Sequence, residues 1–356
     1  MISHSEGTKN FCGRNARARG VRSSASSCKG FSLPELLVSM AVLMVVAGGV
    51  ISIISYNENT FGRTEQQSDM YENVRAVAEL MAQEIGQAGF VDLPGTSAPT
   101  LSAAITKSTS AQSVSVSSTT SMYVGETLMV DTAANEEPVT LTAVTSTSIS
   151  GIFTNNHSSG AVLHAIGVSP NGIVAPSSSA TTSGGVSCVT VPSGMAAYTA
   201  TDGSTCNVLN LWGDLNSDGS LVYVRYTCNT STVPGTLTRS VTTITPGANT
   251  ISTAQTLLST LIANPPTSAP APCFQYDMST QQITVNGVTS TYYMIANIGL
   301  TVSVRTLKPD PVTNQYLTMT KSFLDLSPRN ILAGYEQAYA GDASRLQGVP
   351  PNVTLY

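Results

Sequence analysis

The stretch Lys29-Gly30-Phe31-Ser32-Leu33-Pro34-Glu35 leads directly into a run of apolar residues that reaches Tyr56. From Leu36 to Tyr56 the chain has no charged side chain, and Leu, Val, Ile, Met and Ala dominate. Because a helix rises 1.5 Å per residue, about 20 such residues cross a hydrocarbon core of about 30 Å. The sequence therefore predicts a membrane-spanning helix over about residues 31–56.

Glu35 is the charged residue at the start of this apolar segment. A carboxylate inside a membrane costs on the order of 3 kcal/mol, so we expect Glu35 to have a specific partner. The alternative is a side chain that extends to the lipid headgroups without a specific contact.

Residues 1–30 carry six basic residues and one acidic residue. Positive charge beside an apolar span stays in the cytoplasm, so the rest of the chain is expected outside. An ordinary secretory signal has small residues after its apolar run, whereas Tyr56-Asn57-Glu58-Asn59 follows here. The segment is typical of a cytoplasmic leader, and an uncleaved single-span anchor is the alternative. Without this leader, ten of the 16 Lys and Arg residues and 20 of the 21 acidic residues remain.

The helix is expected to continue beyond the membrane, so that it covers residues 31–90 in all. Apolar residues recur every three or four positions, which is typical of a helix with one buried face. Gly86 and Gly89 mark its end. A helix of about 55 residues is roughly 80 Å long. The predicted buried stripe consists of Met70, Val74, Val77, Met81, Ile85 and Ala88, and the polar face includes Glu72, Glu79 and Glu84.

The composition changes after Val91, where Ser, Thr, Val, Gly and Pro dominate and helical periodicity ends. Short alternating runs such as Val222-Tyr223-Val224-Arg225-Tyr226 are typical of β-strands. We therefore predict an α+β fold in which a long N-terminal helix packs on a β-rich head at residues 91–356. The size of the head suggests two β lobes, with a possible inserted β module at about 101–167. The polar segment after Ile331 is expected to be loosely packed.

Four cysteines remain once the leader is removed. An even number of cysteines outside the cytoplasm favours disulfides. Residues 207–212 and 221–227 are predicted to form a hairpin, and the pairing that we expect places Cys206 opposite Cys228. We therefore predict a Cys206–Cys228 disulfide, which leaves Cys188 to pair with Cys273.

The turn of this hairpin, Asp214-Leu215-Asn216-Ser217-Asp218-Gly219-Ser220, alternates oxygen-bearing side chains and ends near a glycine. It matches the first half of a calcium-loop pattern, in which Asp214, Asn216 and Asp218 would bind the ion. The twelfth position, however, is Arg225 instead of a bidentate Glu, and strands are expected on both sides instead of helices. A polar turn held by local backbone hydrogen bonds is the alternative. Calcium is thus the one candidate cofactor.

The sequence lacks the motifs of an enzyme. It has no phosphate-binding loop, no zinc-ligand pair and no Gly-x-Ser-x-Gly sequence. His157 and His164 have no evident metal-ligand companions and are expected at solvated positions. The basic residues after the leader are scattered, so direct binding of nucleic acid is not expected. We therefore expect a protein that is not an enzyme.

The segment from Lys29 to Glu35, together with the apolar run, resembles the class III signal of type IV prepilins and pseudopilins. This resemblance implies that a prepilin peptidase cuts after Gly30 and methylates the new N-terminus at Phe31. It also implies that Glu35 pairs with the free amino group of Phe31 on a neighbouring subunit. Glu35 would then guide the packing of subunits in a filament.

The segments Asn73-Val74-Arg75 and Met81-Ala82-Gln83-Glu84-Ile85-Gly86-Gln87-Ala88-Gly89-Phe90 resemble the W-type (PilW) minor pilins of type IV pili. They also resemble the J-type minor pseudopilins of type II secretion. The resemblance implies an inner-membrane protein with a periplasmic head that later joins a pilus at the cell surface. The expected partners are prepilin peptidase, other minor and major pilins, and the inner-membrane assembly platform. A secretion pseudopilin and a tip adhesin whose inserted module binds a ligand remain alternatives, while a tethered enzyme is disfavoured.

Overall fold

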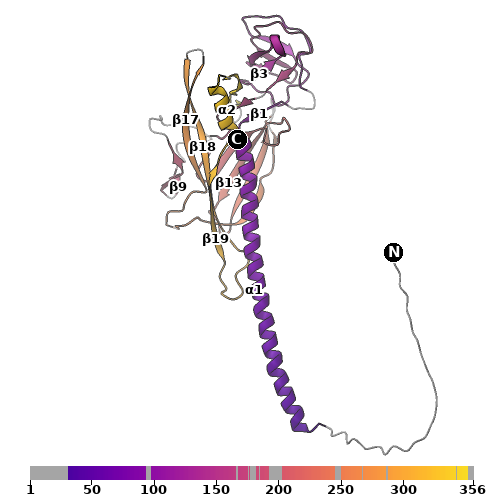
Figure 1. Ribbon diagram of the computed structural model, residues 1–356, viewed down its shortest axis with the longest axis vertical. Helices are drawn as coiled ribbons and strands as arrows, with labels where there is room; N and C mark the ends of the chain where they lie inside the picture. Colours follow the sequence, from indigo (N-terminus) through magenta and orange to yellow (C-terminus); the bar gives the residue numbers. More distant parts are fainter. Residues whose placement is uncertain are drawn as a thin grey trace, which may run out of the picture. The chain divides into compact units, whose positions relative to one another are not determined.

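The computed structural model describes residues 31–93, 98–165, 167–174, 176, 182–183, 185–191, 203–244, 250–266, 268–285, 288–341 and 343–351. The chain divides into two compact units, residues 1–58 and 59–356. We call the second unit the head. The predicted α+β class is confirmed, because one long helix is followed by a β-rich region (Figure 1).

The long helix α1 runs from Leu33 to Gln87 and has 55 residues. Its second part belongs to the head, where one face is buried against the β-sheet. The chain turns away at Gly89, which has a φ of +79°. A side chain at Gly89 would lie 2.5 Å from the carbonyl oxygen of Ser169, so the close approach requires glycine. The buried residues of the helix are Met70, Val74, Val77, Ala78, Met81, Glu84 and Ile85.

The helix packs on a nine-stranded sheet in which seven strands follow the order β11-β17-β18-β16-β14-β13-β12, with β15 paired to β14 and β19 paired to β18. Neighbouring strands are antiparallel except β11 and β17, which are parallel. The strands are β11 (Val189–Thr190), β12 (Val208–Gly213), β13 (Val222–Asn229), β14 (Gly235–Thr243), β15 (Thr250–Ile251), β16 (Gln255–Ile262), β17 (Phe274–Val285), β18 (Val288–Arg305) and β19 (Thr318–Leu326).

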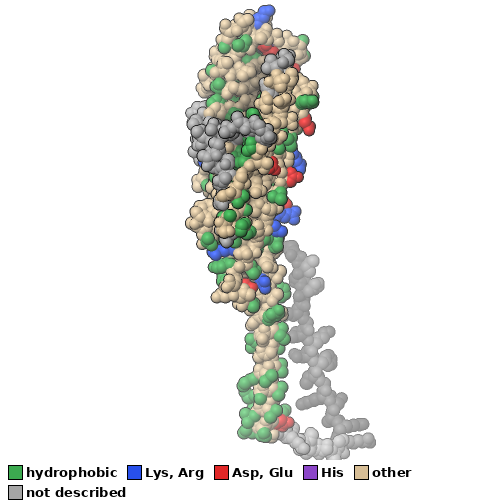
Figure 2. Space-filling model, turned by 90° about the vertical axis from the view of Figure 1, so that its left-hand side faces the viewer, with side chains coloured by type: hydrophobic (Ala, Val, Ile, Leu, Met, Phe, Trp, Pro, Cys, Tyr) green, Lys and Arg blue, Asp and Glu red, His purple; other side chains and the backbone are tan. Residues whose placement is uncertain are grey.

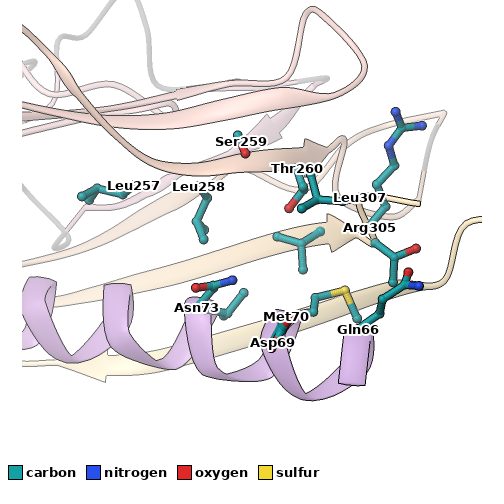
Figure 3. A pocket seen from close by; sticks show the side chains of 13 residues that line it. Gln66, Asp69, Met70, Asn73, Leu257, Leu258, Ser259, Thr260, Arg305 and Leu307 are labelled. Atoms are coloured by element: carbon teal, nitrogen blue, oxygen red, sulfur yellow. The ribbon is translucent and has the colours of Figure 1, made fainter. Parts of the chain in front are cut away.

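This sheet consists of two half-sheets that share a short seam. β12–β16 form the first half-sheet, and β11 with β17–β19 forms the second. The halves meet where β16 and β18 pair at Leu261–Val304 and Ile262–Ser303, whereas β17 and β18 pair along their full hairpin. Beside the seam lies a cavity between α1 and the sheet, which is lined by Gln66, Met70, Leu258, Thr260 and Val304, among others (Figure 3).

A smaller β region, which we call the module, occupies residues 98–165. It is enclosed by β1 (Phe90–Val91) and β8 (Gly167–Val168), which pair with each other. Its own core contains Leu128, Ile149 and Phe153, and this core continues onto Trp212 and Tyr223 of the first half-sheet. One of its sheets has β2 (Gln112–Ser115), β6 (Ser148–Gly151) and β5 (Ala143–Val144); the other has β4 (Glu137–Thr140), β3 (Thr127–Val130) and β7 (Leu163–His164).

The expectation of a loosely packed C-terminal segment is wrong. Residues Arg329–Tyr339 form helix α2, which buries Ile331, Tyr335 and Ala338 in the core of the head. These apolar residues are spaced by four and three positions, which is a helical pattern that the polar composition obscured. Beyond α2, the side chain of Gln347 exchanges two 2.9 Å hydrogen bonds with the backbone of Thr127 in the module.

The four cysteines form two disulfides, but the predicted partners are wrong: Cys188 is bonded to Cys206, and Cys228 to Cys273. The β12–β13 hairpin exists, yet its register differs by one residue. Trp212 pairs with Tyr223, whereas a register with Cys206 opposite Cys228 would place Trp212 opposite Val222. A shift of one residue moves side chains to the opposite face of a sheet. Each disulfide joins a residue beside or within the first half-sheet to one just before a strand of the second.

Candidate processing and assembly site

The chain changes from a non-helical segment to a helix immediately after Phe31. Phe31 is 76% exposed, and α1 begins at Leu33. The carbonyl oxygen of Ser32 accepts the N–H groups of Glu35 and Leu36, at 3.0 and 3.1 Å, which closes the first helical turn. Phe31 thus lies outside the regular helix. Gly30, the other residue of the predicted cleavage site, lies outside the described residues.

Glu35 occupies the first turn of α1, and its side chain is exposed. Negative charge is favourable there because the N-terminus of a helix carries partial positive charge. None of the ion pairs among the described residues involves Glu35. Its carboxylate is therefore open to a cation from another molecule, as the predicted pairing with an N-terminal amine requires.

The apolar part of α1 is exposed on all sides. An 18-residue window of this helix has a mean hydropathy of 2.6 and no residue buried inside the protein, so the helix is long and apolar enough to cross a membrane. The hydroxyl of Ser39 donates to the carbonyl oxygen of Leu36 at 2.9 Å, which satisfies a polar group within the helix itself. A helix of this kind requires lipid or other apolar helices around it.

The predicted calcium loop has the contacts of a polar turn. One carboxylate oxygen of Asp214 accepts the N–H of Asp218 at 3.0 Å, and the other accepts the N–H of Gly219 at 2.9 Å. Asp218 in turn accepts the N–H of Ser220 at 2.8 Å. Within the described residues, no group of three or more His, Cys, Asp or Glu side chains is placed to hold a metal ion. Calcium binding by Asp214, Asn216 and Asp218 stays a prediction.

His157 is not at a solvated position, so that expectation is wrong. It is 3% exposed and lies in the module between two carboxylates. Its Nδ1 is 3.1 Å from Asp131, and its Nε2 is 2.7 Å from Glu137. The module therefore contains a histidine enclosed by two carboxylates, and we call these three side chains the His157 cluster. His164 lies in β7 and is half-buried.

The sequence predicts Glu84 on the polar face of the helix, but this prediction is wrong, because Glu84 is 4% exposed. Its carboxylate binds the guanidinium of Arg239 on β14 and the hydroxyl of Tyr226 on β13. The position follows Met81 by three residues, so it falls on the buried stripe, and this spacing could have predicted it. The ion pair fixes α1 against the first half-sheet, which sets the position of the helix within the head.

Glu126 is another buried carboxyl that sequence reasoning missed. It is 0% exposed, and burial raises its pKa to about 8, although a hydrogen bond from the N–H of Tyr123 opposes the shift. Its second oxygen has no hydrogen-bond partner among the described residues. The group is therefore mostly protonated near neutral pH.

Comparison with known proteins agrees with this N-terminal geometry. Residues 25–51 match the family model described as the prokaryotic N-terminal methylation motif. No curated protein and no solved structure matches the chain. The match indicates a pilin or pseudopilin that prepilin peptidase processes, anchored in a membrane by its apolar helix with the head C-terminal to it. The predicted cleavage site and Glu35 both lie inside the matched segment.

Proposed function

We propose that this protein is a minor pilin of a type IV pilus, a structural subunit that takes part in pilus initiation and has no catalytic activity. The observation that carries the proposal is the exposed apolar helix, headed by Phe31 and Glu35, within a matched methylation motif. Such a helix can exchange lipid for the helices of neighbouring subunits at little cost, since both surroundings are apolar.

Glu35 sets the register of this exchange in the proposed mechanism. Before assembly, its carboxylate lies at the edge of the membrane, where an unpaired charge is costly. After cleavage behind Gly30, the amino group of Phe31 on an adjacent subunit supplies the opposite charge. The register between two helices at which these charges pair is therefore favoured over registers in which one helix is shifted along the other. The subunit is expected in the inner membrane first, with a periplasmic head, and in the pilus afterwards.

The proposed register role predicts that Glu35→Ala leaves leader cleavage intact and abolishes incorporation into pili. Glu58→Ala is the matched control, because Glu58 is an exposed carboxylate on the same helix outside the apolar run. Immunoblots of sheared pili measure incorporation, and the mass of the membrane-bound form measures cleavage. Normal incorporation of Glu35→Ala would contradict the register role.

The pilus assignment itself is tested by the quantity of pili sheared from cells that lack the gene, compared with the parent and a complemented strain. We expect a sharp loss that complementation restores, because minor pilins prime assembly. Unchanged pili would contradict a priming role and favour a minor pseudopilin of type II secretion.

A tip adhesin is a second candidate, and the module favours it. The ends of the module meet at the β1–β8 pair, and the module lies at one end of the head, although its core continues onto Trp212 and Tyr223 of the first half-sheet (Figure 1). Replacing residues 98–165 by a short glycine linker distinguishes the two functions. Normal pili with lost adhesion would support the adhesin, whereas lost pili would support a structural role for the module.

A further inference from the structure

The loop between β18 and β19, residues 306–317, is held in one shape by its own hydrogen bonds. The N–H of Thr306 donates to Leu317 at 2.9 Å, and that of Asp310 donates to Gln315 at 2.8 Å. Asp310 is 1% exposed, and its carboxylate accepts a 3.0 Å hydrogen bond from the N–H of Val312. The loop is therefore a preformed surface and not a mobile connection.

An ion pair fixes this loop to α1. Arg63 of the helix lies 3.7 Å from the carboxylate of Asp310, whose side chain is buried. Figure 1 shows the loop beside the helix, where β19 begins. Because the acidic group of the loop is turned inward and paired, the outer surface of the loop lacks its negative charge.

The outer surface of the loop combines apolar and basic side chains. Leu307 is 78% exposed and Val312 is 64% exposed, so the loop presents two large aliphatic side chains to its surroundings. Lys308 is exposed between them. Arg305 lies 4.1 Å from the centre of the ring of Tyr316, and Figure 3 shows its side chain beside Leu307. Figure 2 shows basic and hydrophobic side chains together at the lower end of the head.

The attachment point of the loop is close to the apolar segment along the helix. Arg63 follows Tyr56 by seven residues, which corresponds to about 10 Å of helix. The headgroup layer of a bilayer extends about 5–8 Å beyond the hydrocarbon on each side. Phe61, which is 73% exposed, lies on the same short stretch. The residue to which the loop is fixed, Arg63, is therefore only a few ångströms of helix beyond the headgroup layer.

We propose that the outer surface of this loop rests on the headgroup layer of the membrane while the subunit waits for assembly. Aliphatic tips, a tyrosine ring and basic side chains with long apolar stems are the groups that bind this layer. The contact holds the head at one angle to the membrane, which presents the helix to an incoming subunit in one orientation. The inference rests on the proposed membrane-anchored state, but it does not require a pilus.

The test uses the full-length protein with Cys12→Ser and Cys28→Ser, reconstituted in nanodiscs that contain phosphatidylethanolamine and phosphatidylglycerol. A nitroxide is attached at position 307 through Leu307→Cys, or at position 152 through Ile152→Cys as the control, since Ile152 is an exposed apolar residue of the module. Collision rates with oxygen and with a nickel chelate report whether each label is in lipid or in water.

We expect the ratio of oxygen to nickel collisions to be severalfold higher at position 307 than at position 152. We also expect the ratio at 307 to fall with Lys308→Glu or when phosphatidylglycerol is omitted. Equal ratios at the two positions would overturn the proposal. A label at 307 that is shielded only after a second pilin is added would also overturn it and indicate a protein contact. Cleavage behind Gly30 is measured on the same samples, so a failure of the proposed function is recognised separately.

Discussion

The module and the nine-stranded sheet are both β structures in one head, yet they are stabilised by different means. The two half-sheets share a short seam and are joined by two disulfides. The module has no disulfide; instead, His157 lies between Asp131 and Glu137 in its interior. The difference shows that a small ladder can be reinforced covalently or electrostatically, and that each choice makes stability depend on a different solution condition.

The largest expected effect is the loss of the disulfide between the half-sheets. Cys228→Ser together with Cys273→Ser opens a loop whose ends are 45 residues apart, and this should lower the free energy of unfolding by about 4 kcal/mol. Urea unfolding measures the loss, and hydrogen exchange should show faster opening in β16 and β18 than in β3 and β4.

The second disulfide should have a smaller effect. Cys188→Ser together with Cys206→Ser opens a loop whose ends are 18 residues apart, and this should lower the free energy of unfolding by about 3 kcal/mol. A loss below about 1 kcal/mol for the longer loop would contradict the role assigned to the seam.

The next effect concerns the His157 cluster. Glu137→Gln removes a buried charge that accepts hydrogen bonds from Thr154, Asn155 and His157, so we expect the module to lose about 3 kcal/mol. The matched control is Glu136→Gln, because Glu136 is the exposed neighbour and should change stability by less than about 0.5 kcal/mol. Exchange in β3 and β4 measures the effect, and equal losses for the two variants would count against the cluster.

The same cluster makes the module sensitive to acid. Burial alone would raise the pKa of Glu137, but hydrogen bonds from Thr154 and His157 lower it overall. The hydrogen bond from His157 likewise lowers the pKa of Asp131. A carboxyl with a lowered pKa stabilises the fold above its ordinary pKa of about 4, and this stability is lost as the pH falls below that value. When the pH is lowered, the module should therefore unfold locally at a higher pH than the disulfide-linked sheet does.

The smallest effect has the opposite sign. Burial raises the pKa of Glu126 to about 8, so the folded module favours the protonated group while the unfolded chain ionises near pH 4.5. Stability should fall as the pH rises from about 4.5 to about 8 and then level off. Glu126→Gln removes this dependence and should stabilise the protein by about 1 kcal/mol at pH 7, after the cost of burying an amide. Melting temperatures of both proteins across this pH range provide the measurement, and parallel curves would refute the assignment.

What the sequence predicted depended on local pattern. The apolar run after Glu35 and the stripe from Met70 to Ile85 specify a helix through residues three and four apart, so α1 and the fold class followed from composition and spacing. Helix α2 has the same kind of signal at Ile331, Tyr335 and Ala338, but it is short and surrounded by polar residues. Three apolar positions among polar residues are a weaker signal than the long stripe of α1.

What the sequence did not predict depends on contacts between distant residues. The disulfide partners require the exact register of β12 and β13, and a shift of one residue is enough to exchange faces. The burial of His157 depends on two carboxylates that are 20 and 26 residues away. No local pattern in the sequence distinguishes the two hairpin registers, and none distinguishes a buried histidine from a solvated one. Both features therefore depend on the tertiary structure.

The disulfide pattern also bears on how the chain acquires its bonds. The cysteines pair in the order in which they occur, Cys188 with Cys206 and then Cys228 with Cys273. A head that is exported with its N-terminal side first would expose each pair in turn. An oxidase that joins thiols as they arrive would therefore form the native bonds directly, with no need for an isomerase to rearrange them.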